Sequence, residues 1–126
     1  MPKKNNMEKI LLVEDDPFLI DIYTTKLKGA GFTVKVVEEG EAVLPALKES
    51  MPDVLVLDIV LPQIDGWEIL RMIQKEKTLK KLKIVVLSNL GQKSEVEKGL
   101  KLGAMKYLIK AHYTPSEVVE EIKKVI

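Results

Sequence analysis

Short apolar stretches alternate with segments of helical spacing along this chain. Five stretches rich in leucine and β-branched residues predict strands: Ile10–Val13, Thr33–Val37, Val54–Leu57, Ile84–Leu87 and Tyr107–Ile109. Continuous apolar runs of this length are typical of strands buried on both faces of a parallel sheet. Apolar residues at the helical period follow each strand: Phe18, Leu19, Ile22, Tyr23 and Leu27; Val43, Leu44 and Leu47; Ile69, Leu70 and Ile73; Val96 and Leu100; Val118, Val119, Ile122 and Val125. The pattern predicts an α/β fold with five strands and five helices.

The composition of each predicted strand indicates its place in the sheet. Lys35 interrupts the second strand and the fifth has only three apolar residues, so these two fit the edges. Right-handed crossovers then favour a doubly wound, five-stranded parallel sheet in the flavodoxin-like order 2-1-3-4-5. In such sheets ligands bind beyond the carboxyl ends of the strands, next to the switch point between strands 1 and 3. We therefore expect the functional site at that edge.

Residues that begin and end helices agree with this division. Asp16 before Pro17 predicts only a helix N-cap, and Thr114–Glu117 has the pattern of a capping box. Gly31 and Gly103 stand where helices are expected to end. Gly99 lies inside the fourth helical stripe, where glycine costs about 1 kcal/mol relative to alanine. We therefore expect the fourth helix to be the least firmly held.

Composition narrows the class of protein. The 126 residues suit one domain, expected over residues 8–126 after a polar, disordered tail at residues 1–7. The net charge of +1 argues against direct nucleic-acid binding. The absence of cysteine excludes a disulfide scaffold, thiolate zinc sites and a cysteine nucleophile. No apolar run is long enough to span a membrane, so a cytoplasmic location is expected.

Polar side chains end four of the predicted strands at one edge of the sheet. Glu14 and Asp15 follow the first strand, Asp58 the third, Ser88 the fourth and Lys110 the fifth. Carboxylates that converge in a partly desolvated cleft repel one another, and a hard cation resolves the repulsion. A few oxygen ligands with room for water suit Mg²⁺. With the lysine and the hydroxyl, the cluster predicts a pocket for an anionic, oxygen-rich group such as phosphoryl.

Five sequence blocks resemble the signature blocks of response-regulator receiver domains, the CheY-like family, in order and spacing. They are Leu12–Pro17, Asp53–Pro62, Ile64–Gly66, Val86–Ser88 and Tyr107–Lys110. The resemblance covers the chain from about Glu8 to its end. It implies two-component phosphorelay signalling, in which a sensor histidine kinase or a phosphotransfer protein supplies the phosphoryl group. A protein of this kind acts as a signalling switch and is not a turnover enzyme.

The resemblance also implies roles for single residues. Asp58 matches the phosphoacceptor, and Asp15 the direct Mg²⁺ ligand. Glu14 matches the acid that contacts the metal through water, and the backbone carbonyl of Val60 completes the metal's protein ligands. Lys110 matches the lysine that contacts the phosphoryl oxygens.

The same resemblance implies how the signal leaves the site. Ser88 matches the hydroxyl residue that moves toward the phosphoryl group, and Tyr107 the aromatic residue that turns inward behind it. The output surface for a downstream protein target is then the fourth helix, fifth strand and fifth helix. A phosphorylation-dependent dimer is a further implication.

Ala111 and Asn89 depart from the family pattern; Asn89 stands after Ser88 where a small apolar residue is more usual and is expected to crowd access to the site. The family has proline after the lysine, whereas Ala111 stands here, and a cis bond before alanine costs about 2.5–4 kcal/mol. Either the strain is tolerated or the bond is trans with a relaxed loop. Val60 and Leu90 occupy positions that tune self-dephosphorylation in this family, and both are apolar. We expect them to position an attacking water poorly and to give a long-lived phosphorylated form.

Other interpretations share parts of the pattern. A receiver-like docking module that works without phosphorylation and a receiver fragment of a longer regulator both stay open. A flavodoxin fits poorly because the acids after the first strand would repel a nucleotide phosphate. A haloacid-dehalogenase-type phosphatase needs a second acid where Val60 stands. Gly29-Ala30-Gly31 follows a helix, the reverse of the context that a dinucleotide-binding fingerprint requires.

Three further features receive structural interpretations. The Lys75–Lys83 stretch holds five lysines and one glutamate, and is interpreted as a solvated helix end and loop. His112, the only histidine, is expected on the surface without a catalytic role. Trp67 is expected to be partly buried under the loop that follows Asp58.

Overall fold

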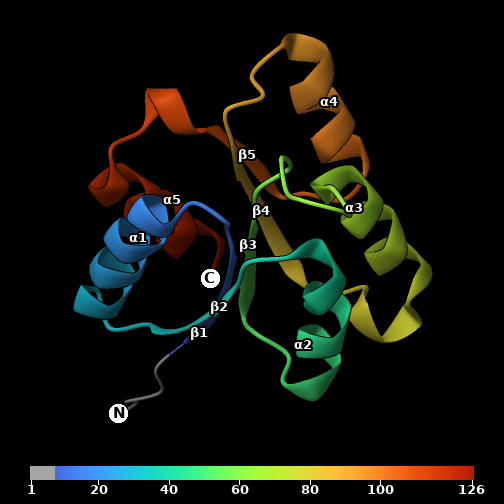
Figure 1. Cartoon of the computed structure of the whole chain (residues 1–126), viewed down its shortest axis with the longest axis horizontal. Coiled ribbons are helices and arrows are strands. Elements are labelled where there is room, and N and C mark those ends of the chain that lie inside the picture. Colours follow the sequence, from blue (N-terminus) through green and yellow to red (C-terminus); the bar gives the residue numbers. More distant parts are fainter. Residues whose placement is uncertain (1–7) are drawn as a thin grey trace.

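The computed structural model describes residues 8–126, so the tail predicted at residues 1–7 lies outside the described residues. Its centre is a five-stranded parallel sheet in the order β2-β1-β3-β4-β5 (Figure 1). The strands are β1 (Lys9–Val13), β2 (Thr33–Val37), β3 (Val54–Leu57), β4 (Lys83–Ser88) and β5 (Lys106–Ile109). The doubly wound fold and the strand order predicted from the sequence are confirmed. β1, β4 and β5 each begin one residue earlier than predicted, at a lysine.

Five helices cover the two faces of the sheet. They are α1 (Pro17–Gly29), α2 (Val43–Glu49), α3 (Gly66–Lys75), α4 (Lys93–Lys101) and α5 (Pro115–Val125). Three short 3-10 helices, η1 (Gly40–Ala42), η2 (Lys77–Leu79) and η3 (Lys110–His112), lie in connecting segments. α1 and α5 lie on one face of the sheet, and α2, α3 and α4 lie on the other (Figure 1). Within residues 8–126, no helix is long and apolar enough to cross a membrane.

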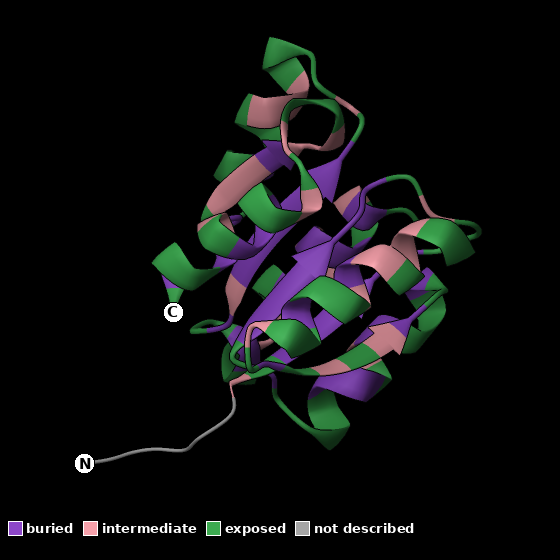
Figure 2. Ribbon diagram, turned by 90° about the vertical axis from the view of Figure 1, so that its left-hand side faces the viewer, coloured by how far each residue is buried: buried purple, intermediate pink, exposed green. Residues whose placement is uncertain are grey.

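The core is divided by the sheet into two apolar layers. Alternate strand residues point to opposite faces, so Leu11 and Leu55 pack with α2 and α3, whereas Ile10 and Val54 pack with α1 and α5. Every residue of β3 is buried, and the strands form the buried centre of the molecule in Figure 2. Burial of apolar side chains on both faces explains why the central strands carry continuous apolar runs.

The predicted helix ends match the structure. The Asp16 carboxylate accepts hydrogen bonds from the backbone of Phe18 (2.9 Å) and Leu19 (3.3 Å) at the start of α1. Thr114 and Glu117 form the reciprocal capping box of α5. Gly31 and Gly103 have φ angles of +97° and +113°, in the left-handed region that favours glycine after a helix.

Two residues that the helical spacing placed in the core are exposed, because the face that each helix buries is not the face that carries them. Phe18 is 71% exposed, because α1 faces the core with Tyr23 and Leu27, which lie on roughly the opposite side of the helix from Phe18 at about 100° per residue. Leu100 is 46% exposed, because α4 turns its neighbour Gly99 toward β5 instead. Gly99 is the buried residue of α4.

Candidate functional site

The sheet register places Glu14 and Asp58 side by side. Val13 pairs with Leu57 across β1 and β3. The backbone bonding continues one residue further, because the Asp58 amide donates to the Val13 carbonyl at 3.1 Å and the Glu14 amide donates to the Val37 carbonyl at 3.1 Å. Both acids are therefore fixed by the backbone at the carboxyl edge of the sheet, where the strand order changes direction.

Three carboxylates converge at this edge. Glu14, Asp15 and Asp58 each place one oxygen so that the three oxygens lie within 4.8 Å of one another. Glu14 is 1% exposed and Asp58 is 5% exposed, whereas Asp15 lies on the surface. Opposite ligands of one Mg²⁺ ion are about 4.2 Å apart, twice the metal–oxygen distance, so this spacing is close to what the ion requires. The donor set consists of hard oxygens and has an open side, and so it fits Mg²⁺.

Lys110 bridges the two buried acids. Its Nζ atom lies 2.7 Å from Glu14 Oε1 and 2.7 Å from Asp58 Oδ2. No cis peptide bond occurs within residues 8–126, so the bond between Lys110 and Ala111 is trans. η3 begins at Lys110, and from there the side chain reaches both carboxylates. The trans alternative predicted for this departure is therefore the one found.

Burial and charge compete at the bridge. Burial raises the pKa of the Glu14 carboxyl above its usual value, and the hydrogen bond and charge of Lys110 offset only part of that effect. Burial acts in the opposite direction on Lys110, but its hydrogen bonds to Asp58 and Glu14 outweigh burial and raise the pKa of its ammonium. The lysine therefore stays charged. The formal charges of the three carboxylates and the ammonium sum to −2, which a divalent cation balances.

The loop after β3 depends on Gly66, which the sequence indicated only as the last residue of the Ile64–Gly66 block. The Gly66 amide donates to the Ile59 carbonyl at 2.8 Å as α3 begins. A Cβ at this position would lie 2.6 Å from Ile59 Cα and 2.8 Å from the Asp58 carbonyl oxygen. Only glycine fits such a close approach. The sequence signal was the glycine directly after the N-cap Asp65. Within the loop, the Val60 amide donates to Asp58 Oδ1 at 3.2 Å.

Ser88 and Tyr107 meet through the backbone of one residue. The Ser88 hydroxyl is fully buried and accepts a hydrogen bond from the Leu90 amide at 3.3 Å. The Tyr107 hydroxyl donates to the Leu90 carbonyl at 2.7 Å. Burial, followed by the charges of Glu95 and Asp58, raises the pKa of Tyr107 to about 12. Any movement of the Ser88 side chain that releases the Leu90 amide therefore acts on the segment that holds Tyr107.

The remaining candidates add no carboxylate to the cluster, although the Asp16 amide donates to Glu14 Oε2 at 3.2 Å. His112 is exposed, as predicted. Asp16 is exposed and caps α1. Trp67 is half-buried and packs against the core layer on its face of the sheet, and the Lys98 Nζ atom of α4 lies 4.4 Å from the centre of its ring. The prediction that Trp67 is covered by the Asp58 loop does not anticipate this contact with α4.

Comparisons with known proteins agree with this geometry. The family model of the response regulator receiver domain matches residues 10–123. The DNA-binding response regulator MtrA of Mycolicibacterium smegmatis is 33% identical over 116 residues, which are 92% of this chain and 49% of that protein.

Solved structures show the same likeness. A BeF3-activated DrrB receiver domain superposes with a TM-score of 0.81 at 32% identity, covering 94% of this chain and 97% of that one. The BeF3-activated N-terminal receiver domain of RstA from Klebsiella pneumoniae gives a TM-score of 0.84 at 27% identity, covering 92% and 96%. The chain spans about half the length of the curated relatives it matches. It belongs to the response regulator receiver domains, the phosphorelay signalling modules of two-component systems.

Proposed function

We propose that this chain is a Mg²⁺-dependent phosphoryl acceptor that takes its phosphoryl group on Asp58 from a sensor histidine kinase or a phosphotransfer protein. The observation that carries the proposal is the environment of Asp58. This carboxylate is nearly buried, its Oδ2 atom lies 2.7 Å from Lys110 Nζ, and Glu14 and Asp15 are beside it. Such a protein is a cytoplasmic switch whose phosphorylation changes a protein-binding surface, and it performs no turnover of a separate substrate.

The reaction needs positioning and charge compensation more than other chemistry. A carboxylate oxygen of Asp58 attacks the phosphorus of a phosphohistidine, and the phosphorus–nitrogen bond breaks. Its electron pair goes to the imidazole nitrogen of the partner, which takes a proton from solvent. Asp58 then carries an acyl phosphate. Lys110 offsets the negative charge of the phosphoryl oxygens from its place on Asp58.

The acidic cluster is the proposed metal site. Asp15, Asp58 and the Val60 carbonyl would hold Mg²⁺ directly, and Glu14 would hold it through water. Mg²⁺ when bound supplies charge neutralisation for the carboxylates and the incoming phosphoryl oxygens. Glu14 also fixes Lys110, because its Oε1 atom accepts from Nζ at 2.7 Å.

The output follows from the shared contacts of Leu90. A phosphoryl group on Asp58 attracts the Ser88 hydroxyl, which then no longer accepts from the Leu90 amide. The segment that accepts from Tyr107 moves with Leu90. We expect the change to reach the surface made by α4, β5 and α5, which binds the downstream target or a second phosphorylated copy. The curated relatives are about twice as long as this chain. If the chain is part of a longer regulator, we expect the same surface to pass the signal to the rest of that protein.

Phosphorylation by a small donor tests the proposal. The chain is incubated with acetyl phosphate and Mg²⁺, and intact mass spectrometry measures the addition of one phosphoryl group. Asp58→Asn should abolish the addition, and the exposed N-cap variant Asp65→Asn should keep it. Chelation of Mg²⁺ should prevent the reaction. Absence of a phosphoryl group in the wild type, or its survival in Asp58→Asn, favours the docking module that works without phosphorylation.

The lifetime of the phosphorylated form tests the role of two apolar residues. Val60 is 56% exposed and Leu90 is half-buried, and neither side chain has a polar atom that could orient water toward Asp58. We expect slow loss of the phosphoryl group. Leu90→Glu adds a carboxylate near the phosphoryl group and should accelerate the loss several-fold. A rapid loss in the wild type that Leu90→Glu leaves unchanged would contradict this assignment.

A further inference from the structure

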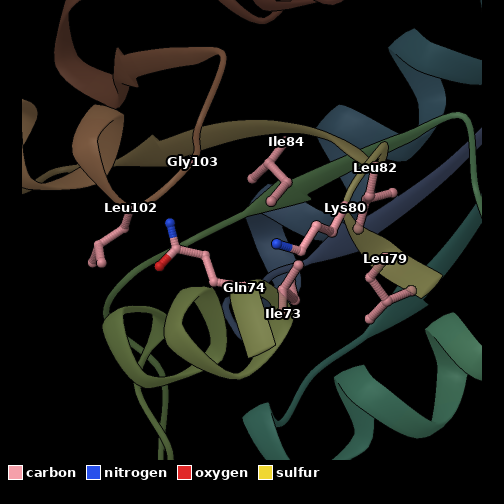
Figure 3. Close-up of a pocket in the computed structure, with 8 residues that line it drawn as sticks. All are labelled: Ile73, Gln74, Leu79, Lys80, Leu82, Ile84, Leu102 and Gly103. Carbon is pink, nitrogen blue, oxygen red and sulfur yellow. The ribbon is translucent and has the colours of Figure 1, made fainter. Parts of the chain in front are cut away.

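A pocket lies at the end of the sheet away from Asp58. It has a volume of about 410 Å³ and is formed by the end of α3, the segment from η2 into β4, and the turn after α4 (Figure 3). Its floor is apolar, because Ile73, Leu79, Leu82 and Ile84 line it and are all buried. The pocket contains no residue of the phosphorylation site.

Two polar side chains lie at the rim of this apolar floor. Lys80 extends from the segment after η2 toward Gln74, across Ile73 and Ile84 (Figure 3). Gln74 comes from α3, and its Nε2 atom lies 3.7 Å from the position that a Cβ at Gly103 would take. One ammonium and one amide thus border a cavity with an aliphatic floor, a combination that small-molecule sites also use.

The lysines around the pocket have no acidic partners among the described residues. The Lys75–Lys83 stretch has five lysines, and its one acid, Glu76, pairs with Lys48 at 3.6 Å. Among residues 8–126, none of these five lysines forms a salt bridge. Lys80 differs from the other four because it lines the pocket. The interpretation of the stretch as a merely solvated helix end therefore leaves out the apolar surface beside Lys80.

We propose that this pocket binds a small amphipathic organic anion, an aliphatic carboxylate. The aliphatic part packs on Ile73, Leu79 and Ile84, where it removes apolar surface from water. The carboxylate accepts hydrogen bonds from Lys80 Nζ and from the Gln74 amide. Inorganic phosphate lacks the apolar part, and a neutral aliphatic molecule leaves the ammonium without a counter-charge. The volume of the pocket lies within the range of small-molecule sites, about 300–1,000 Å³.

An NMR titration with sodium octanoate tests the proposal on the full chain. Amide signals of Ile73, Leu79, Ile84 and Gly103 should shift with saturation, and those of Glu14 and Asp58 should stay. Lys80→Met should weaken binding about tenfold, the typical effect of losing a charge-assisted hydrogen bond. Lys77→Met is the matched control, because Lys77 is an exposed lysine of the same stretch that does not line the pocket, and it should bind as the wild type does.

Two further titrations test whether the charge of the ligand and the phosphorylation site matter for binding. Octan-1-ol has the same chain without the charge and should bind more weakly than octanoate. Asp58→Asn should leave octanoate binding unchanged, because the pocket is independent of phosphorylation. Equal weakening by Lys77→Met and Lys80→Met would overturn the proposal, since it would indicate a diffuse attraction to the lysines. Octanol binding as tightly as octanoate, tighter binding of an acidic peptide, or no localised shifts would overturn it as well.

Discussion

α4 and α5 flank the same edge of the sheet but are held in different ways. Each helix begins with a capping box, but α5 buries Val118, Val119, Ile122 and Val125. α4 is nine residues long and buries only Gly99. A further contact of α4 is that of Lys98 with Trp67 of α3. The difference shows that α5 is part of the core, whereas α4 buries little of its surface. We therefore expect α4, and not α5, to respond to a change at Asp58.

Alanine substitutions should separate the two helices most clearly. Ile122→Ala removes a fully buried side chain of α5 and should lower the free energy of unfolding by about 2–5 kcal/mol. Leu100→Ala shortens a 46% exposed side chain of α4 and should change it by about 0.5 kcal/mol or less. Urea denaturation followed by circular dichroism measures both values. Similar losses from the two variants would show that α4 is packed as firmly as α5.

Gly99→Ala should disrupt the packing of α4 against Tyr107 of β5. An added Cβ would lie 2.6 Å from Tyr107 Cδ2 and 2.8 Å from Cε2, so the ring or the helix must move. We expect a loss of about 1–3 kcal/mol from overpacking, larger than the helix-propensity gain of about 1 kcal/mol. In a Tyr107→Ala background the ring is absent, and Gly99→Ala should become stabilising. A double-mutant cycle by urea denaturation measures this reversal of sign, and equal effects in both backgrounds would contradict the contact.

The ionisation of Tyr107 should lower the stability of the folded protein at high pH. The pKa of its hydroxyl is raised from 10.0 to about 12, because burial and then the charge of Glu95 on α4 disfavour the phenolate. The folded state therefore keeps a proton that the unfolded state has lost, and stability falls as the pH rises from 10.0 to about 12. The Lys110 ammonium, whose pKa is also raised, contributes in the same direction.

Tyr107→Phe isolates the tyrosine contribution, since Lys110 is present in both proteins. Denaturation at a series of pH values should show a shallower fall for the variant over that range. Parallel curves for the two proteins would show that Tyr107 ionises equally well in the folded and unfolded states.

The sequence predicted the site better than it predicted the contacts of α4, and the reason is physical. Glu14, Asp58 and Lys110 each directly follow a strand, and parallel strands end at one edge, so local patterns were sufficient to gather them. Gly99 was interpreted by its helix propensity alone. Glycine is needed there because the Tyr107 ring, eight residues further along the chain, leaves no room for a Cβ, and no helical period reveals this contact.

Two other misses have the same origin. Phe18 fitted a helical stripe, but a stripe does not tell which of its members the neighbouring elements cover. Gly66 is required by a backbone contact with Ile59 that forms only when the loop after β3 folds back onto itself. Local spacing therefore predicts which residues share an edge or a face, and tertiary packing decides which of them are covered.

Removing the contact of Lys98 with Trp67 should have the smallest effect on the free energy of unfolding. It also allows the position of α4 to be followed by fluorescence. The ammonium lies 4.4 Å from the ring centre on the surface, where a cation–π contact contributes about 0.5–1 kcal/mol. Lys98→Met should lower the free energy of unfolding by that amount, and Lys101→Met, on the same helix, should not. Because Trp67 is the only tryptophan, its emission reports the distance between α3 and α4. Adding BeF3 and Mg²⁺ should change the tryptophan emission of the wild type and of Lys101→Met. The change should be smaller in Lys98→Met, because that variant lacks the contact between Lys98 and Trp67. An equal response in all three proteins would show that Trp67 senses the metal site, and that α4 stays in place when Asp58 is occupied.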